Sequence, residues 1–458
     1  MSRGVVYVLF GVLSFCLRLF FESQSKIITG INGGYYPVQV RSIIEHGHLA
    51  MNDMPLVFYI NAYLAKLAIY VFPNYSSEFL ILQTVKVLGA LSIPLILIPL
   101  YRIIHNYLSY EIPKFLEYSL IAFCMFSFSS LYLSAEMLKN AYGLVGFTYL
   151  LYYTLLFFDH RSLKFAIYMA ISLLVIGTTH FGVFAISIIF LVLFLISVYN
   201  KKAIVPIISL VVIGFLMVFI FDHFRALNAV NIVEKWFGKP WRIVFYPTGI
   251  ASLFISAFLI LILFLLNRNK KVDIRQKQLF TVFLGFIIML SLPFLRFELW
   301  RRFNLMVFIP QVVAILLAYP YLKTFFKKRV PQVLVFICCL SVGYSLLLPK
   351  QNSISDAAYE DLSNMSKQIE NPDRAITFVR HGLDWWVSWQ LRTKIAQPQI
   401  ELDKAMSDKY DNILIIRQHK GRYDLYPGPG SPFESPPVPK NSALLYNSEY
   451  YKLYQWIK

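Results

Sequence analysis

Polar side chains that could do chemistry gather between the first two long apolar runs, in residues 22–78. The carboxylates Glu45 and Asp53 are of the type needed for a general base, which takes a proton from a reacting group. The amide of Asn32 and the guanidinium of Arg41 lie in the same stretch. A loop that faced lipid would seldom keep so many polar groups, so we expect this one to cover a cavity.

Basic side chains stand at the ends of several apolar runs, at Lys86, Lys139, Arg296, Arg301 and Arg302. Cations there could stabilise an anionic phosphate, and the arginine fork suits bidentate phosphate contact. The alternative is that these side chains extend to the membrane surface as ordinary span ends. Glu136 either accepts a proton or solvates a short turn, and His180 is either a hydrogen-bonding turn residue or a substrate contact.

The composition identifies the kind of protein that must position these groups. The 458-residue chain is 57% hydrophobic and 15% charged, with a mean hydropathy of +0.58. Soluble domains carry about 25% charged residues, and disordered chains lack this apolar content. The composition excludes both classes and predicts an all-α polytopic membrane protein. The four cysteines lie in apolar runs, so they indicate neither a disulfide scaffold nor a Cys/His metal cluster.

Spanning helices need about 20 apolar residues each. We predict them at 5–21, 79–101, 115–132, 141–158, 164–179, 182–199, 203–221, 249–267, 279–295, 304–322 and 331–348. The run 55–72 is also apolar enough, but a span there would move every later basic loop to the other side. If 55–72 lies flat in the outer interface, the basic stretches 268–277 and 323–329 share the side of the N-terminus, as the positive-inside rule requires. We therefore predict about eleven spans, a cytoplasmic N-terminus and an extracytoplasmic C-terminus.

Nearly all of the net charge of +18 belongs to the membrane part of the chain. Residues 350–458 hold 14 basic and 13 acidic side chains, and the rest of the chain holds 29 basic and 12 acidic ones. The excess is typical of loops that face an anionic leaflet, with some cations left for an anionic substrate. This charge distribution does not favour a nucleic-acid partner. We predict that the protein lies in the inner membrane of a bacterium.

The C-terminal tail has a different pattern. We predict a membrane module over 1–348 and a small extracytoplasmic α/β domain over 349–458. Within the tail, 355–370 is expected to be helical, 381–391 a short amphipathic helix, and 375–379 and 412–416 strands. The Pro/Gly-rich stretch 426–439 is expected to be a loop.

Taken in order, the polar motifs resemble the GT-C superfamily of polytopic glycosyltransferases, which use lipid-phosphate-linked sugar donors. The matching features are Tyr35-Tyr36, Arg41, Gly47, the stretch 55–59, Lys86, the stretch 99–102, the stretch 134–140 and the stretch 301–310. The resemblance covers most of residues 1–320 and implies interfacial helices in the first outer loop. Together with the positions of basic residues at span ends, it leads us to assign substrate binding to Tyr35, Tyr36, Arg41, Lys86, Lys139, His180, Arg296, Arg301 and Arg302.

One position departs from the family pattern. The family's catalytic aspartate is expected shortly before the second tyrosine, where this chain has Asn32. An amide has no basic lone pair near neutral pH, so it cannot act as a general base. Three interpretations follow: another carboxylate does the work, the acceptor needs no strong base, or transferase activity has been lost. The candidate carboxylates are Glu22, Glu45, Asp53 and Glu136.

The leading hypothesis is a transferase that moves a sugar from a polyprenyl-phosphate carrier to a glycan, lipid or protein acceptor outside the cytoplasm. In it, Asp53 or Glu45 is the base, Asn32 orients the acceptor or donor, and the basic residues hold the phosphate. The sequence assigns no cofactor; a divalent cation stays open, but no motif indicates one. The alternatives are a transporter or flippase for a lipid-linked glycan, and a catalytically degenerate scaffold protein.

Overall fold

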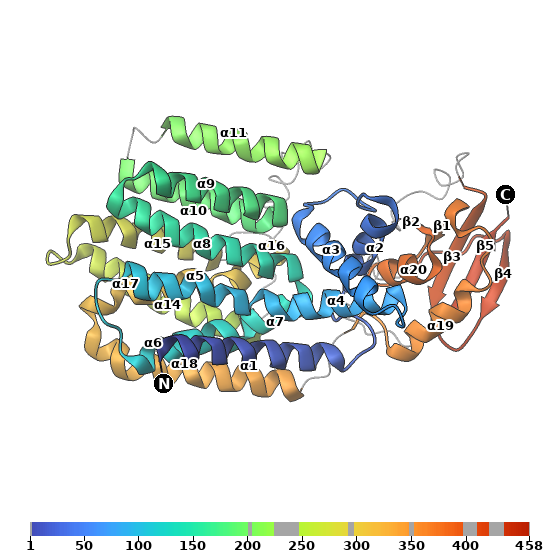
Figure 1. Cartoon of the computed structure of the whole chain (residues 1–458), viewed down its shortest axis with the longest axis horizontal. Helices are drawn as coiled ribbons and strands as arrows, with labels where there is room; N and C mark the ends of the chain where they lie inside the picture. Colours follow the sequence, from blue (N-terminus) through green and yellow to red (C-terminus); the bar gives the residue numbers. More distant parts are fainter. Residues whose placement is uncertain are drawn as a thin grey trace. The chain divides into compact units, whose positions relative to one another are not determined.

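Helices account for most of the chain in a computed structural model, which describes residues 2–199, 204–223, 247–291, 297–347, 352–396, 410–420 and 435–457 (Figure 1). The first helices are α1 (Arg3–Ser23), α2 (Tyr35–His46), α3 (Leu56–Val71), α4 (Ser77–Ser92), η1 (Pro94–Ile96), α5 (Leu97–Arg102) and η2 (Ile103–Tyr107). There follow α6 (Lys114–Phe126), α7 (Phe128–Glu136), α8 (Leu138–His160), α9 (Leu163–Thr179), α10 (Phe181–Tyr199) and α11 (Ile204–Phe221). The last helices of the apolar part are α14 (Pro247–Arg268), α15 (Ile274–Ser291), α16 (Phe297–Met306), α17 (Phe308–Ala318), η4 (Tyr319–Tyr321) and α18 (Lys323–Leu347).

Over the residues that the structure describes, each of the eleven predicted spans overlaps one of these helices or a run of consecutive ones; residues 203, 292–295 and 348 of the predicted spans lie outside the description. Eight helical segments of the described chain are long and apolar enough to cross a membrane, or nine if α16 and α17, bent by 43°, count as one span. Two further predicted spans coincide with the shorter apolar helices Leu163–Thr179 and Ser252–Arg268. The chain is a multi-pass membrane protein. The predicted interfacial run 55–72 is α3, another short apolar helix.

Some predicted spans are broken. The predicted span 115–132 is two helices, because the backbone at Ser127 is extended (φ −65°, ψ 155°) between α6 and α7. The predicted turn near 133–140 is shorter than expected, since α7 continues to Glu136 and α8 starts at Leu138. Met137 alone separates the two helices.

Close helix packing explains the apolar bundle. A methyl group on Gly143 of α8 would lie 2.8 Å from the Val183 side chain of α10, and one on Gly146 would lie 2.7 Å from Ile176 of α9. Small residues let membrane helices approach this closely, where dispersion forces hold them together. Helices α8, α9 and α10 accordingly pack side by side (Figure 1).

The chain divides into two compact units. Unit 1 comprises Met1–Arg18, Asn52–Val57 and Gly89–Leu348, and unit 2 comprises Leu19–Met51, Phe58–Leu88 and Pro349–Lys458. Unit 2 therefore joins most of the first predicted outer loop to the C-terminal tail. The division into domains 1–348 and 349–458 stays a prediction.

The tail contains a small α/β fold, as predicted. Its elements are α19 (Asp356–Ser366), η5 (Pro372–Arg374), β1 (Ala375–Phe378), α20 (Asp384–Leu391), β2 (Lys394–Ala396), β3 (Asn412–Gln418), β4 (Ser442–Asn447) and β5 (Tyr451–Trp456). The five strands are ordered β2-β1-β3-β5-β4. Strands β2, β1 and β3 are parallel to one another, β5 is antiparallel to β3, and β4 is antiparallel to β5. The predicted strands and the helix at 355–370 are confirmed. The helix predicted over 381–391 starts three residues later and buries Trp386 and Trp389 almost completely.

Candidate active site

A buried ion pair in unit 1 joins two of the predicted site residues. The ammonium of Lys139, in the first turn of α8, lies 2.8 Å from Oδ2 of Asp53, in the segment before α3. The two side chains are 6% and 13% exposed. A cation in the first turn of a helix opposes the helix dipole, and a buried charge is stable only with a partner. The carboxylate of Asp53 therefore compensates both costs and holds Lys139 in place.

Two more predicted site residues lie on helices that pack together in the same unit. The guanidinium of Arg301, on α16, lies 5.7 Å from the centroid of the Tyr132 ring on α7, and Glu136 follows one turn later on α7. The amide of Asn140, next to Lys139, donates to Sδ of Met306 at the end of α16 (3.8 Å). Arg301 thus packs against α7, the helix that ends at Glu136, and the first turn of α8, which carries Lys139, touches the end of α16 through Asn140.

A buried arginine that the sequence analysis did not nominate fixes α7. Arg18, at the end of unit 1's part of α1, donates from Nε to the Ser134 hydroxyl (3.0 Å) and from Nη2 to the Met125 carbonyl (2.8 Å). It also donates to the backbone carbonyl of Ser14 (3.2 Å). Hydrogen bonds to oxygen atoms are what allow a guanidinium to be buried. Arg18 therefore sets the position of the helix that carries Glu136.

The first predicted outer loop, in unit 2, places Asn32 in an exposed turn. The carbonyl of Asn32 accepts the backbone N–H of Tyr35 (3.0 Å), so the turn leads directly into α2. The next two residues must be glycines, because a methyl group on Gly33 would lie 2.2 Å from the carbonyl oxygen of Ile28. Tyr36 is buried, whereas Tyr35 is half-buried and accepts a hydrogen bond from the Gln39 amide (3.0 Å).

Arg41 lies under the C-terminal helix α20. Its guanidinium stacks 4.5 Å from the Trp389 ring centroid and donates to the carbonyls of Trp389 (2.6 Å) and Ser388 (2.9 Å). Burial lowers the pKa of this guanidinium from its ordinary value. These carbonyls end α20, where a cation is favoured. Arg41 thus joins α2 to α20.

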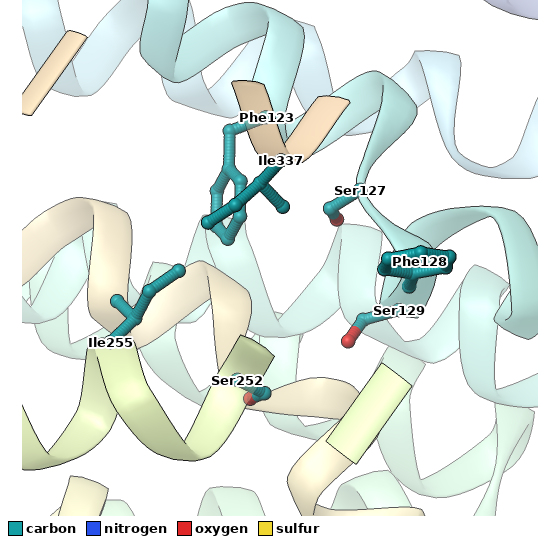
Figure 2. A pocket seen from close by; sticks show the side chains of 7 residues that line it. All are labelled: Phe123, Ser127, Phe128, Ser129, Ser252, Ile255 and Ile337. Atoms are coloured by element: carbon teal, nitrogen blue, oxygen red, sulfur yellow. The ribbon is translucent and has the colours of Figure 1, made fainter. Parts of the chain in front are cut away.

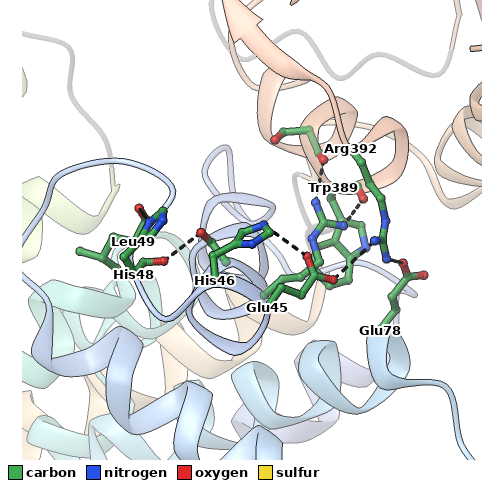
Figure 3. A network of polar contacts seen from close by, with 10 residues as sticks. Glu45, His46, His48, Leu49, Glu78, Trp389 and Arg392 are labelled. Carbon is green, nitrogen blue, oxygen red and sulfur yellow. Dashed lines mark hydrogen bonds and ion pairs between the residues drawn. The ribbon is translucent and has the colours of Figure 1, made fainter. Parts of the chain in front are cut away.

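Glu45, a predicted base, belongs to an ion-pair network on the same helix. Oε1 of Glu45 lies 3.5 Å from Arg392, which also contacts Glu78 at 3.2 Å (Figure 3). The carboxylate and the guanidinium are partly exposed, so the pair is worth little stability on its own. The network connects α2, the first turn of α4 and the residue after α20.

Lys86 and Glu22 hold the start of the loop. The ammonium of Lys86 donates to the backbone carbonyls of Glu22 (3.1 Å) and Ser25 (2.6 Å). The carboxylate of Glu22 accepts the Thr29 hydroxyl and its N–H (3.2 Å to N). Both side chains are buried, so their contacts close a tight loop over residues 22–29.

The remaining predicted residues lie apart from these clusters or outside the described chain. His180 accepts the N–H of Val183 through Nδ1 (3.2 Å), which caps the start of α10. Arg302 is exposed, and Arg296 lies outside the described residues. Within the ranges that the structure describes, His, Cys, Asp and Glu form no group that could hold a metal ion.

A small cavity lies in unit 1, lined by Phe123, Ser127, Phe128, Ser129, Ser252, Ile255 and Ile337 (Figure 2). Its volume of about 10 Å³ is the space of one water molecule. Its hydroxyls could bind a water. The cavity is far too small for a sugar or a lipid, so it is not a substrate site.

A histidine–aspartate pair that the sequence analysis did not nominate lies just before α20. Nδ1 of His381 is 3.0 Å from Oδ2 of Asp384. The sequence signal was the His-x-x-Asp spacing ahead of two tryptophans, which we assigned only to an amphipathic helix. The pair belongs to unit 2, together with Asn32.

Comparisons with known proteins identify the fold of this chain. No protein-family model and no curated protein match the sequence. Solved structures do match. ArnT from Cupriavidus metallidurans bound to undecaprenyl phosphate is 11% identical, with a TM-score of 0.55, over 99% of this chain and 98% of ArnT. The oligosaccharyltransferase AglB from Archaeoglobus fulgidus, in complex with an inhibitory peptide and a dolichol-phosphate, is 12% identical, with a TM-score of 0.57, over 90% of this chain and 69% of AglB.

Both matched proteins are GT-C glycosyltransferases. The chain therefore has the GT-C membrane fold that its motifs predicted. Because ArnT is matched over nearly its full length, the likeness includes the C-terminal tail as well as the helices.

Proposed function

We propose that this protein is a membrane glycosyltransferase that moves a sugar from a polyprenyl-phosphate carrier to an acceptor outside the cytoplasm. The observation that carries the proposal is Lys139, a buried cation held by a carboxylate at 2.8 Å. The GT-C fold supports it, since ArnT was solved with undecaprenyl phosphate and AglB with a dolichol-phosphate. Both ligands are polyprenyl phosphates, and we infer that this protein uses a donor of the same class.

The cations of unit 1 would bind the donor phosphate. When the bond between the sugar and the phosphate breaks, the phosphate gains negative charge, and fixed cations stabilise that charge best where water is excluded. Lys139 is almost fully buried and Arg301 is half-buried. Both are partly desolvated before substrate binds, which strengthens their interaction with an anion.

The predicted carboxylate bases have other partners. Asp53 contacts the Lys139 ammonium, and Glu45 contacts the Arg392 guanidinium. We therefore assign Asp53 to positioning Lys139, and Glu45 to the contact between α2 and the tail. Glu136 stays a candidate contact for the acceptor or for the donor sugar.

The membrane orientation is part of this proposal. Positive-inside counting places the N-terminus in the cytoplasm and the tail outside. The bacterial inner membrane would supply the polyprenyl-phosphate carrier. The acceptor is then an extracytoplasmic glycan, lipid or protein.

The test is sugar transfer by the purified full-length protein from a panel of polyprenyl-phosphate-linked sugars to membrane extracts of the source cell. We expect transfer by the natural protein and a loss on the order of 100-fold in Arg301→Ala, the size typical of one lost transition-state donor. Lys139→Met should lose at least as much. Lys270→Ala, at an exposed lysine in the predicted cytoplasmic stretch 268–277, is the matched control and should retain full transfer.

Three results would overturn the proposal or part of it. Absence of transfer with every donor would favour the scaffold hypothesis, and movement of the intact lipid-linked glycan between leaflets would favour the transporter. Full activity of both Arg301→Ala and Lys139→Met would show that the phosphate is bound elsewhere.

A further inference from the structure

Two exposed arginines of unit 1 lie against one buried ring. Cζ of Arg161, in the turn between α8 and α9, lies 5.3 Å from the centroid of the Phe158 ring, and Cζ of Arg275, in the first turn of α15, lies 5.2 Å from it. The Phe158 side chain is 1% exposed. Helix α10 packs against α8, α9 and α15, so all of these elements belong to one bundle (Figure 1). The fold therefore gathers two cations from distant parts of the sequence at one place on its surface.

Each guanidinium is held by a further contact. Nη1 of Arg161 donates to the hydroxyl of Tyr199 at the end of α10 (2.9 Å), and Cζ of Arg161 lies 5.2 Å from the centroid of that ring. Nη2 of Arg275 donates to the backbone carbonyl of Phe158 (3.0 Å). A guanidinium has five N–H donors. Among the described residues these bonds use one donor of each arginine, so most of the donors are left for a ligand.

Neither guanidinium forms an ion pair with a carboxylate of the described residues. The acidic side chains nearest in sequence have other partners. Oδ2 of Asp273 accepts the backbone N–H of Arg275 at the start of α15 (2.9 Å). The Asp159 carboxylate is hydrogen-bonded to the hydroxyl of Tyr107. Like charges that share one ring repel each other, so an anion bound beside them stabilises both.

The backbone at Arg161 favours a role for this side chain beyond ending a helix. Arg161 follows the last residue of α8 in the left-handed conformation (φ +50°, ψ +31°). Glycine usually takes this position because it has no Cβ, so an arginine here gives up some backbone stability. Strained residues of this kind gather at ligand-binding sites.

Apolar side chains next to the two arginines face outward. Leu163, the first residue of α9, is 75% exposed, and Ile274, the first residue of α15, is 67% exposed. Each lies within two residues of one of the arginines. In a chain that spans a membrane, exposed apolar side chains at helix ends contact lipid. A ligand that matches both surfaces carries an anionic group together with acyl chains.

We propose that Arg161 and Arg275 form a binding site for the phosphate of an anionic phospholipid, whose acyl chains lie against the exposed apolar residues that begin α9 and α15. Arginine suits this ligand, because its planar fork donates two parallel hydrogen bonds to a phosphate. Both arginines lie on the side that the positive-inside rule assigns to the cytoplasm, where anionic lipids attract basic residues.

This lipid site is separate from the cations proposed to bind the sugar donor. Lys139 lies in the first turn of the 23-residue helix α8, whereas Arg161 follows its last residue. The two sites are therefore at opposite ends of one helix. Lipid binding at Arg161 does not depend on whether the protein transfers sugar.

A simpler role must be separated from this one. Basic residues at cytoplasmic span ends orient a chain in the membrane without binding any particular lipid. That role depends on charge alone, so Lys270, which is exposed in the same basic stretch as Arg275, would serve it equally well. A built site depends instead on the two arginines that share the Phe158 ring.

The experiment titrates the purified full-length protein, in a neutral detergent, with phosphatidylglycerol and follows binding by native mass spectrometry. Zwitterionic phosphatidylcholine is the reference. We expect phosphatidylglycerol to bind at least about tenfold more tightly, and Arg275→Gln and Arg161→Gly each to lose about tenfold, the effect of one charge-assisted hydrogen bond. Lys270→Ala is the matched control and should keep the natural affinity.

The unfolding midpoint without added lipid separates lost binding from lost folding. Glycine fits the left-handed backbone at position 161, so Arg161→Gly should keep its midpoint while it loses the lipid. Soluble glycerol phosphate, which has the headgroup phosphate but no acyl chains, should not displace phosphatidylglycerol at the same concentration.

Four results would overturn the proposal. They are equal affinity for the two lipids, natural affinity in both Arg161→Gly and Arg275→Gln, a loss in Lys270→Ala as large as in Arg275→Gln, and displacement of the lipid by an equal concentration of glycerol phosphate. The third result would mean that charge alone attracts the lipid, and the fourth would mean that the site binds phosphate without regard to acyl chains.

Discussion

At the scale of single residues, buried charge is the feature that most constrains this protein. Lys139 and Asp53 lose most of their contact with water, and each is stable there because the other is close. Lys26 and Glu360 form an ion pair of the opposite kind, with both side chains mostly exposed. Because water already solvates an exposed pair, its loss changes little.

The contrast gives a prediction about stability. Lys139→Met leaves the Asp53 carboxylate buried without its ammonium, which costs about 3–5 kcal/mol. We expect a clear fall in the thermal unfolding midpoint in detergent, and partial recovery when Asp53→Leu is added. Lys26→Met is the control, and it should leave the unfolding midpoint almost unchanged. Equal effects of Lys139→Met and Lys26→Met would contradict this account.

At the scale of elements, the contact of α2 with α20 joins the first loop to the tail within unit 2. At one end of this contact, the Arg41 guanidinium stacks on the Trp389 ring. At the other end, the backbone of Gly34 packs against Trp385 and Trp386. A change that separates the two helices should therefore lower the stability of unit 2.

Gly34→Ala tests the contact directly. The new methyl group would lie 2.9 Å from the Trp385 backbone and 2.9 Å from the Trp386 ring, and overpacking of this kind costs about 1–3 kcal/mol. We expect a lower unfolding midpoint. Gly343→Ala in α18 is the control, since nothing lies within 4 Å of its added methyl group, and it should be neutral or slightly stabilising. A neutral Gly34→Ala would show that the segments do not pack closely in solution.

At the scale of the whole molecule, hydrophobic spans and loop charge set how the chain crosses the membrane. Every predicted span overlaps helix within the described part of the chain, and α3 is one of the three shorter apolar helices found there. Whether α3 spans decides the parity of the chain, so it decides on which side the tail lies. The proposed function needs the tail and the first loop on the same, outer side.

A phosphatase that is active only outside the cytoplasm measures this parity. Fused after Lys458 it should be active, and fused within the basic stretch 268–277 it should be inactive. Activity at 268–277 with none at Lys458 would mean that the topology is inverted or that α3 spans, and it would remove the basis for an extracytoplasmic acceptor.

The sequence predicted the helices well and the tail in part. Apolar runs near 20 residues must be helical in lipid, because no other single segment satisfies its own backbone. The strands β2, β4 and β5 were not predicted. In β4, the exposed side chains of Leu444 and Leu445 leave no clean alternation of buried and exposed positions. The break at Ser127 was not predicted either, because both flanking runs are apolar and the sequence has no glycine or proline there.

The sequence by itself determined that this is a multi-pass membrane protein with GT-C motifs and an asparagine where a carboxylate was expected. Composition and order along the chain carry that information, because the bilayer acts on each apolar run separately. Only the tertiary structure decided what each polar group contacts. It paired Asp53 with Lys139 and Arg41 with the end of α20, and it brought Gly382 next to Ile31, in the turn that holds Asn32. Distances between residues far apart in sequence arise from packing, and spacing along the chain does not encode them.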